Sequence, residues 1–265
     1  MKRLIYQVCL GKESRSKLYD HCIKSVKAYC EKRGFDHYVL TSPKLRIAPD
    51  PFATNRSVDS YQKHGGFLPI YEKENAFDLL DQYDQIAIVD ADIYIRDGAP
   101  SIFDDFGTDH PWGGVVEREM PLTDQYVGKI LNYSHMQYGV LHKKMNKFSP
   151  NKRGYEFFNM GMILLNSELF KPYLKGQSAK QFINRMEFKD FVDGIGPWKW
   201  STDQTLLNFF LKKHDVPVKH LAHVWNGLYT ANTKIDECYF VHFFLKDKLP
   251  SRGENVEELM RLIND

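Results

Sequence analysis

The sequence predicts an α/β fold with a mixed, mainly parallel central sheet flanked by helices. Residues 4–10 form an apolar run, residues 16–33 have helical periodicity, and residues 37–41 form a second short apolar run. Strand, helix and strand in this order form a βαβ unit, which implies parallel strands and a right-handed crossover. Residues 86–89 are all apolar, as is typical of a strand buried on both faces.

The composition is that of an ordered and nearly neutral protein. Hydrophobic residues make up 43% of the 265 residues, enough for a sizeable core, and we expect one domain over residues 1–265. Lysine and arginine number 36 and aspartate and glutamate 34, which leaves a net charge of +2. This balance argues against a dedicated nucleic-acid binder.

The four cysteines have neither paired nor zinc-type spacing and are predicted to be buried thiols. They favour a reducing compartment, so we expect a cytoplasmic protein. Residues 4–10 form too short an apolar run for a signal peptide, and no small-residue cleavage site follows, so they are predicted to be the first strand. No apolar run is long enough to span a bilayer, so membrane association is expected to be weak or absent.

Later elements follow from periodicity, caps and turn residues. Further strands are expected at 112–117, 157–166, 216–220 and 238–244, and further helices at 70–83, 178–191, 202–213 and 254–263. Residues 43–66 are predicted to be a loop or flap. Residues 119–155 are polar and aromatic with weak periodicity, which predicts an irregular insert or lid, with a loosely helical surface excursion as the alternative.

Two carboxylates, Asp90 and Asp92, end the apolar run that begins at residue 86. A core strand tolerates two charges only when something compensates them. Residues two apart on a strand point the same way, so both carboxylates are expected to share one cation at the strand end. Carboxylate oxygens suit Mg²⁺ or Mn²⁺, which commonly bring a phosphate with them. The alternative is a strand that ends in an Asp-capped turn.

Three downstream segments carry polar residues that could join this site. Asn159 and Gly161 interrupt an apolar strand, where a side-chain amide and bare backbone can approach a ligand. Asp203 and Gln204 begin a helix, whose dipole favours a carboxylate. His242 lies within an apolar strand as either a core histidine or a nitrogen ligand that suits Mn²⁺.

In this order the motifs resemble those of the retaining nucleotide-sugar glycosyltransferases with the GT-A fold, and most of all family 8, with its glycogenin-like and lipopolysaccharide galactosyltransferase-like enzymes. Residues 90–92 are similar to the family's D-x-D motif, residues 158–161 to its F-N-x-G strand, and residues 203–208 to its D-Q-x-x-L-N helix. His242 and Lys248 are similar to the H-x-x-G-x-x-K segment. Leu245 stands where that segment has glycine.

The resemblance implies a cofactor and a donor substrate. Asp90, Asp92 and His242 would bind Mn²⁺, with Mg²⁺ as an alternative, and the ion would bridge the phosphates of a UDP-sugar. Lys248 would neutralise the leaving diphosphate. The metal and the lysine would together stabilise the charge that develops on the leaving phosphate.

The remaining implied roles concern the sugar, the acceptor and the uridine of the donor. Asn159, Asp203 and Gln204 would border the sugar and acceptor as catalytic residues, and Lys73 would lie near the donor. The loop at residues 10–13, including Gly11, would hold the uridine.

The predicted activity is therefore transfer of a hexose from UDP-glucose or UDP-galactose to a glycan, a lipid-linked saccharide or a protein, with retention of configuration. Residues 119–155 would lie on the acceptor side and residues 251–265 would form a carboxyl-terminal helix. Two alternatives remain. One is a non-catalytic sugar- or nucleotide-binding member of the fold, and the other is a D-x-D phosphatase, against which Tyr94 argues because that class has threonine or valine there.

Overall fold

The central sheet of the computed structural model, which describes residues 1–11, 16–50, 58, 62 and 65–264, has six strands in the order β2-β1-β3-β8-β5-β9. These strands are β1 (Arg3–Val8), β2 (Asp36–Leu40), β3 (Gln85–Val89), β5 (Trp112–Val116), β8 (Phe158–Asn166) and β9 (Val218–His220). Strand β8 runs antiparallel to both neighbours, β3 and β5, whereas the other adjacent pairs are parallel. The predicted mixed, mainly parallel sheet is confirmed.

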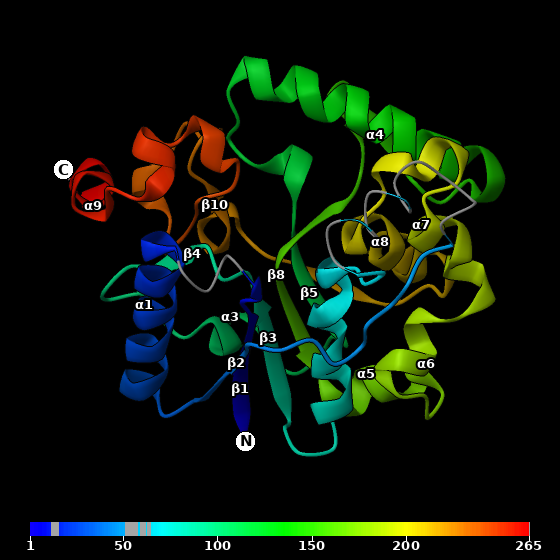
Figure 1. Cartoon of the computed structure of the whole chain (residues 1–265), viewed down its shortest axis with the longest axis horizontal. Coiled ribbons are helices and arrows are strands. Elements are labelled where there is room, and N and C mark those ends of the chain that lie inside the picture. The colour runs from blue at the N-terminus through cyan, green and yellow to red at the C-terminus, as the bar shows by residue number, and fades with distance from the viewer. Residues whose placement is uncertain (12–15, 51–57, 59–61, 63–64, 265) are drawn as a thin grey trace.

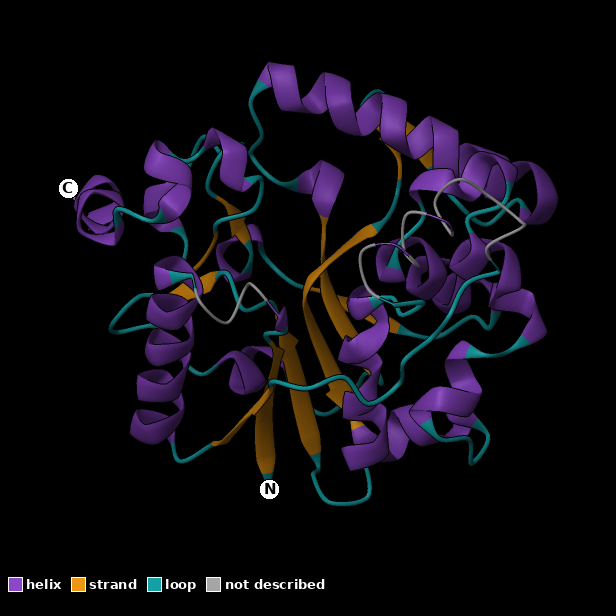
Figure 2. Cartoon of the chain, in the orientation of Figure 1, coloured by secondary structure: helices purple, strands orange, loops and turns teal. Residues whose placement is uncertain are grey.

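Helices lie on both sides of this sheet (Figures 1 and 2). Helix α1 (Lys17–Arg33) lies on one side, and α5 (Ser167–Leu174) and α6 (Ala179–Ile183) lie on the other. Helix α1 ends at Gly34, whose φ of 69° is the left-handed conformation that favours glycine. The predicted βαβ unit is therefore present, with β1 and β2 parallel.

A second sheet of three short strands corrects the prediction that Asp90 and Asp92 point the same way on one strand. It consists of β10 (Gly227–Leu228), β11 (Phe240–His242) and β4 (Ile93–Ile95). Strand β3 ends at Val89, and the chain turns through Asp90 and Asp92 before β4 pairs with β11, with His242 opposite Ile93. The two carboxylates therefore lie on a turn rather than on one strand face, because β4 has left the main sheet.

The irregular insert predicted for residues 119–155 is wrong for most of that segment, and the helical alternative describes it better. It contains α4 (Asp124–Met145), a continuous helix of 22 residues, followed by the hairpin of β6 (Pro150–Asn151) and β7 (Gly154–Tyr155). The buried face of α4 includes the polar side chains of Ser134 and Gln137. Because hydrophobic periodicity counts such residues as exposed, it misses the helix. In Figure 1, α4 runs across the top of the view, beyond one end of the sheet.

Two predicted helices have a different form. Residues 70–83 contain a 3₁₀ helix, η2 (Pro69–Leu79), and residues 178–191 break into α6, η4 (Met186–Phe188) and α7 (Lys189–Asp193). Of the predicted loop at 43–66, residues 51–57, 59–61 and 63–64 lie outside the described residues. The remaining helical segments are α3 (Ile102–Phe106), η3 (Glu117–Glu119), η5 (Gly196–Trp200), α8 (Asp203–Lys213), η6 (His223–Trp225), η7 (Ile235–Glu237), η8 (Lys246–Lys248), η9 (Pro250–Gly253) and α9 (Val256–Asn264).

The main hydrophobic core packs against the central sheet. Its buried residues come from every strand of that sheet except β9, and β3 is buried along its whole length. A smaller cluster joins α1, β11 and α9. Among the described helices, none has the length and apolarity that a membrane span requires.

Candidate active site

A cavity of about 670 Å³, which we call the main cavity, lies where β1 and β3 end. Leu10 follows β1 and Asp90 follows β3, so the cavity opens at the carboxyl ends of these parallel strands. This is where open α/β sheets bind ligands. Seven of the nine site residues that the sequence predicts line this cavity: Lys73, Asp90, Asp92, Asn159, Asp203, Gln204 and His242.

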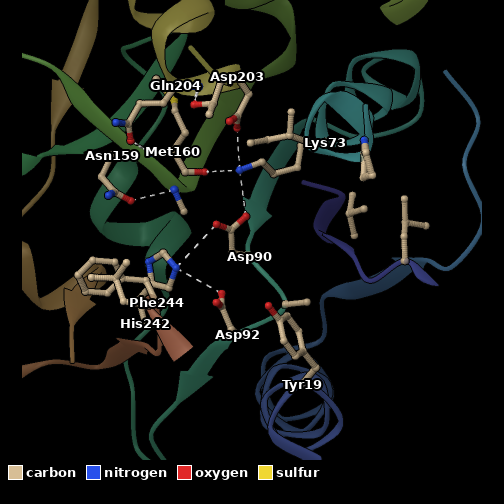
Figure 3. Close-up of a pocket in the computed structure, with 18 of the residues that line it drawn as sticks. Tyr19, Lys73, Asp90, Asp92, Asn159, Met160, Asp203, Gln204, His242 and Phe244 are labelled. Atoms are coloured by element: carbon tan, nitrogen blue, oxygen red, sulfur yellow. Dashed lines mark hydrogen bonds and ion pairs between the residues drawn. The ribbon is translucent and has the colours of Figure 1, made fainter. Parts of the chain in front are cut away.

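Two carboxylates and an imidazole converge on one point of the cavity (Figure 3). Ligand atoms of Asp90, Asp92 and His242 lie within 4.8 Å of one another. The His242 Nε2 atom is 3.3 Å from Asp92 Oδ1 and 3.8 Å from Asp90 Oδ2. This donor set of hard oxygens and one borderline nitrogen fits Mn²⁺.

Lys73 is the positive charge on the other side of Asp90. Its Nζ atom lies 3.0 Å from Asp90 Oδ1 and 2.7 Å from Asp203 Oδ2, and it donates to the Met160 carbonyl at 3.0 Å. Figure 3 shows the ammonium between these two carboxylates. The lysine thus neutralises two acidic side chains and leaves Asp90 Oδ2 directed toward His242.

Burial and charge act in opposite directions on these groups. Burial lowers the pKa of Lys73, but the carboxylates of Asp203 and Asp90 outweigh it and raise that pKa above its usual range. Burial raises the pKa of Asp90. Burial also acts to raise the pKa of Asp92, but the neighbouring His242 lowers it overall. The site therefore favours charged lysine and Asp92 carboxylate, the form in which Asp92 ligates a cation.

Strand β8 and helix α8 contribute the amide side chains. Gln204 Oε1 accepts from the Met160 backbone N–H at 3.3 Å, and the Thr202 side chain caps α8 by accepting from the Gln204 N–H. Asn159 Oδ1 accepts from the Gly161 N–H at 2.9 Å. The contact between Gln204 and Met160 attaches the first turn of α8 to β8, and the two amide side chains are held at the cavity.

The other two predicted residues lie elsewhere. Gly11 follows Leu10 but is not among the described lining residues, and Lys12 and Glu13 of the predicted uridine loop lie outside the described residues. Lys248 is an exposed residue of η8 and does not line the cavity. Leu245 has a φ of 58°, the left-handed conformation expected for the glycine of the family motif.

Sequence reasoning missed two buried polar residues of the site. Asn226 is fully buried and its Oδ1 lies 3.1 Å from His242 Nδ1. Glu117 is 4% exposed and accepts from Asn159 Nδ2 at 2.7 Å. The signals in the sequence are weak: Glu117 is the first of three charged residues after an apolar run, and Asn226 follows the apolar pair Val224-Trp225.

A second pocket of about 280 Å³ adjoins the main cavity, because Tyr133, Asn159, Gln204 and Phe244 line both. Helix α4 supplies one wall of this pocket. The segment predicted as the acceptor-side insert therefore borders the site, although its structure is a regular helix.

No protein-family model matches the sequence, and a comparison with curated proteins finds no match. Solved structures do match it. A glycosyltransferase involved in glycosylation of the major capsid of PBCV-1 is 11% identical, with a TM-score of 0.51 over 98% of this chain and 100% of the other. The galactosyltransferase LgtC, solved with donor and acceptor sugar analogues, is 16% identical, with a TM-score of 0.51 over 98% of this chain and 95% of its own. The protein therefore has the GT-A fold of these glycosyltransferases, as the sequence motifs predicted.

Proposed function

We propose that this protein is a metal-dependent glycosyltransferase that moves a hexose from UDP-glucose or UDP-galactose to a carbohydrate-type acceptor with retention of configuration. The observation that carries the proposal is the cluster of Asp90, Asp92 and His242 in the main cavity of a GT-A fold. These residues would hold Mn²⁺, or Mg²⁺ as an alternative. When bound, the ion would stabilise the negative charge of the leaving diphosphate.

The chain's own cations would share that task. Lys248 is assigned to the leaving diphosphate, and its surroundings support an anion: the ammonium of Lys129 on α4 lowers the pKa of Lys248. An anion between the two ammonium groups would relieve their repulsion. Lys73 is assigned to holding Asp90 and Asp203 in place, since its ammonium already contacts both carboxylates.

In the proposed reaction an acceptor hydroxyl attacks the anomeric carbon from the side that the diphosphate leaves. The bond from the anomeric carbon to the phosphate oxygen breaks, the bond to the acceptor oxygen forms, and the acceptor proton passes to the departing diphosphate. The contacts of Asp203 and Gln204 support this route over a covalent intermediate. Asp203 is ion-paired with Lys73, and an amide such as Gln204 is a poor nucleophile.

The acceptor is assigned to the side that α4 borders. The second pocket is lined by Tyr126 and Tyr133 of α4 together with Phe244, and aromatic rings of this kind suit the apolar faces of sugar rings. A glycan and a lipid-linked saccharide present such rings, whereas a protein hydroxyl, the third acceptor considered, does not. We also propose a cytoplasmic location, which the four buried thiols support because such thiols persist in reducing compartments.

The test is a panel of nucleotide-sugars with Mn²⁺, scored for UDP release by donor hydrolysis. We expect release from UDP-glucose or UDP-galactose that falls by about 100-fold or more in Asp92→Ala, because a lost ligand removes the metal's electrostatic contribution. Asp97→Ala is the matched control, since that carboxylate is 95% exposed and pairs with Lys32 outside the cavity.

Two results would contradict the proposal. One is the absence of turnover with every UDP-sugar while Mn²⁺ and UDP leave the melting temperature unchanged, because ligands that bind the folded state raise it. The other is equal turnover in Asp92→Ala and Asp97→Ala. Release of phosphate from simple monoesters would instead support the phosphatase alternative.

A further inference from the structure

We propose that Asn226 and Glu117 are positioning residues that fix the tautomer of His242, so that its Nε2 lone pair is available to a cation held by Asp90 and Asp92. The inference rests on the metal site of the proposed function but not on any sugar substrate. It adds two residues that no motif contains and gives each a defined task.

A continuous chain of buried hydrogen bonds connects these residues. His242 Nδ1 lies 3.1 Å from Asn226 Oδ1, and Asn226 Nδ2 donates to Asn159 Oδ1 at 2.8 Å. Asn159 Nδ2 then donates to Glu117 Oε2 at 2.7 Å. Tyr126 of α4 closes the chain by donating its hydroxyl to Glu117 Oε1 at 2.8 Å.

The direction of the chain follows from two groups whose hydrogen-bonding roles are fixed. The Gly161 backbone N–H can only donate, and it points at Asn159 Oδ1. A carboxylate can only accept, so Glu117 faces the NH₂ group of Asn159. These two partners agree on one orientation of the Asn159 amide and exclude the flipped one.

The orientation of Asn159 fixes that of Asn226, and Asn226 in turn contacts the His242 imidazole. Because Asn159 presents an oxygen, Asn226 must present its NH₂ group there and its Oδ1 to His242. A carbonyl oxygen needs a donor, so Asn226 favours the tautomer with the proton on Nδ1 and the lone pair on Nε2. Asp92 Oδ1, 3.3 Å from Nε2, favours the opposite tautomer until a cation occupies that carboxylate, so the tautomer of the metal-free protein measures which partner is stronger. In the other tautomer, Asn226 Oδ1 would face a bare nitrogen lone pair inside a buried site, which costs free energy.

Close packing restricts rotation of the His242 imidazole away from Asn226. The imidazole is 6% exposed and Asn226 is fully buried. A Cβ atom on Gly161 would lie 2.4 Å from His242 Cε1, so the glycine allows the ring to lie directly over the β8 backbone. The His242 ring also lies 5.8 Å, centroid to centroid, from that of Phe244. Metal-ligating histidines are oriented in this way by a partner on the second ring nitrogen, and loss of that partner typically weakens metal binding 10- to 100-fold.

The test compares Asn226→Ala with Asn232→Ala. Asn232 is a second buried asparagine, bonded to Lys234 N–H and Cys238 Sγ rather than to the chain that reaches His242. The tautomer is read by imidazole ¹H–¹⁵N correlation spectra of the metal-free protein at a pH where the ring is neutral, and His242→Gln identifies the signal. Titration calorimetry with Mn²⁺ alone measures the affinity.

We expect the proton of His242 on Nδ1 in the parent protein and in Asn232→Ala. In Asn226→Ala we expect a mixture of tautomers and Mn²⁺ binding that is roughly 10- to 100-fold weaker. Glu117→Gln should keep the tautomer, because its amide oxygen can still accept from Asn159, whereas Glu117→Leu should lose it. The two Glu117 variants therefore test the hydrogen-bond chain even if Asn226→Ala fails to fold.

An Nδ1 proton and unchanged Mn²⁺ affinity in folded Asn226→Ala would overturn the inference, as would a parent protein with the proton on Nε2. Failure of the proposed function has a different signature. The parent protein would then bind no Mn²⁺, while the tautomer and its response to Asn226→Ala would still be as described.

Discussion

The two sides of the cavity are built differently. We call Asp90, Asp92, Asn159 and His242 the strand-end wall, because these residues lie in β8 and β11 or on the turn between β3 and β4. We call the residues of α4 and η5 that line the two pockets the helix wall: Tyr126, Lys129, Ile130, Tyr133 and Trp200. His242 is 6% exposed, whereas Trp200 is 61% exposed.

The two walls also differ in the hydrogen bonds that hold them. Backbone hydrogen bonds anchor the strand-end wall to both sheets, since Asp90 N–H donates to Gly161 O and Phe243 N–H donates to Asp92 O. Its side chains are bonded to one another. The helix wall presents aromatic rings and the Lys129 ammonium to the two pockets. A hydrogen-bonded group of candidate metal ligands and a partly exposed aromatic surface therefore border the same site.

The largest effect is expected at the ion pairs that stabilise the strand-end wall. Lys73→Met should lower the free energy of unfolding by roughly 3–5 kcal/mol, because the buried carboxylate of Asp203 and the partly buried one of Asp90 would lose their counter-charge. Chemical denaturation measures the change. Lys171→Met is the control, since its ammonium pairs with the exposed Asp81 and Glu168 and should leave stability nearly unchanged. Equal losses in the two variants would show that the ion pairs of Lys73 stabilise the protein no more than an exposed pair does.

The next effect tests the close packing under His242. Gly161→Ala would place its Cβ atom 2.7 Å from His242 Nδ1 and 3.0 Å from Asn159 Oδ1, so the imidazole or the strand must move. We expect a loss of about 2 kcal/mol in stability, typical of overpacking, together with weaker Mn²⁺ binding. Denaturation and calorimetry on one preparation measure both. A variant that binds Mn²⁺ like the parent protein would show that the strand-end wall tolerates movement.

The strand-end wall was also the part that the sequence predicted well. Asp90, Asp92 and Asn159 follow or interrupt apolar runs, so local patterning places them at strand ends, where parallel strands gather their ligands. His242 was predicted through a motif. Its place opposite Ile93 depends on β4 leaving the main sheet to pair with β11, which no local pattern indicates.

The helix wall was predicted poorly, for a physical reason. Helix α4 buries Ser134, Gln137 and Tyr138, so its inner face is not hydrophobic enough to produce a clear period. Asn226 and Glu117 escaped notice because their partners lie 16 and 42 residues away. A chain of buried hydrogen bonds forms only when distant segments pack together, so the pattern of polar and apolar residues along the sequence does not indicate which residues pair.

An ion pair behind the helix wall gives a pH-dependent test. Burial acts to raise the pKa of Glu156, but the ammonium of Lys212 and the guanidinium of Arg118 lower it below its ordinary value of 4.5. Since the folded-state pKa is depressed, the pair stabilises the protein above about pH 4.5 and stops doing so as the pH falls through the folded-state pKa.

Glu156→Gln should therefore lower the free energy of unfolding by about 1 kcal/mol at pH 7, since the variant loses the negative charge that pairs with Lys212 and Arg118, although its amide oxygen can still accept a hydrogen bond. The difference from the parent protein should shrink toward zero below pH 4. Denaturation curves across this range measure it. A difference that grows as the pH falls would mean that Glu156 is destabilising as a carboxylate.

The smallest effect is expected on the exposed face of α4, and its sign is opposite to that of Gly161→Ala. Gly128 lies in the interior of α4, and a Cβ atom there would meet no heavy atom within 4 Å. Gly128→Ala should stabilise the protein by about 0.5–1 kcal/mol, because alanine loses less backbone entropy than glycine when a helix forms. Mn²⁺ affinity should stay unchanged, since the nearest wall of the site is built from other residues of the helix. Replacement of glycine by alanine would then destabilise the protein at Gly161, where no space is free, and stabilise it at Gly128, where space is free. Destabilisation by Gly128→Ala would show that α4 is packed as tightly as the strand ends.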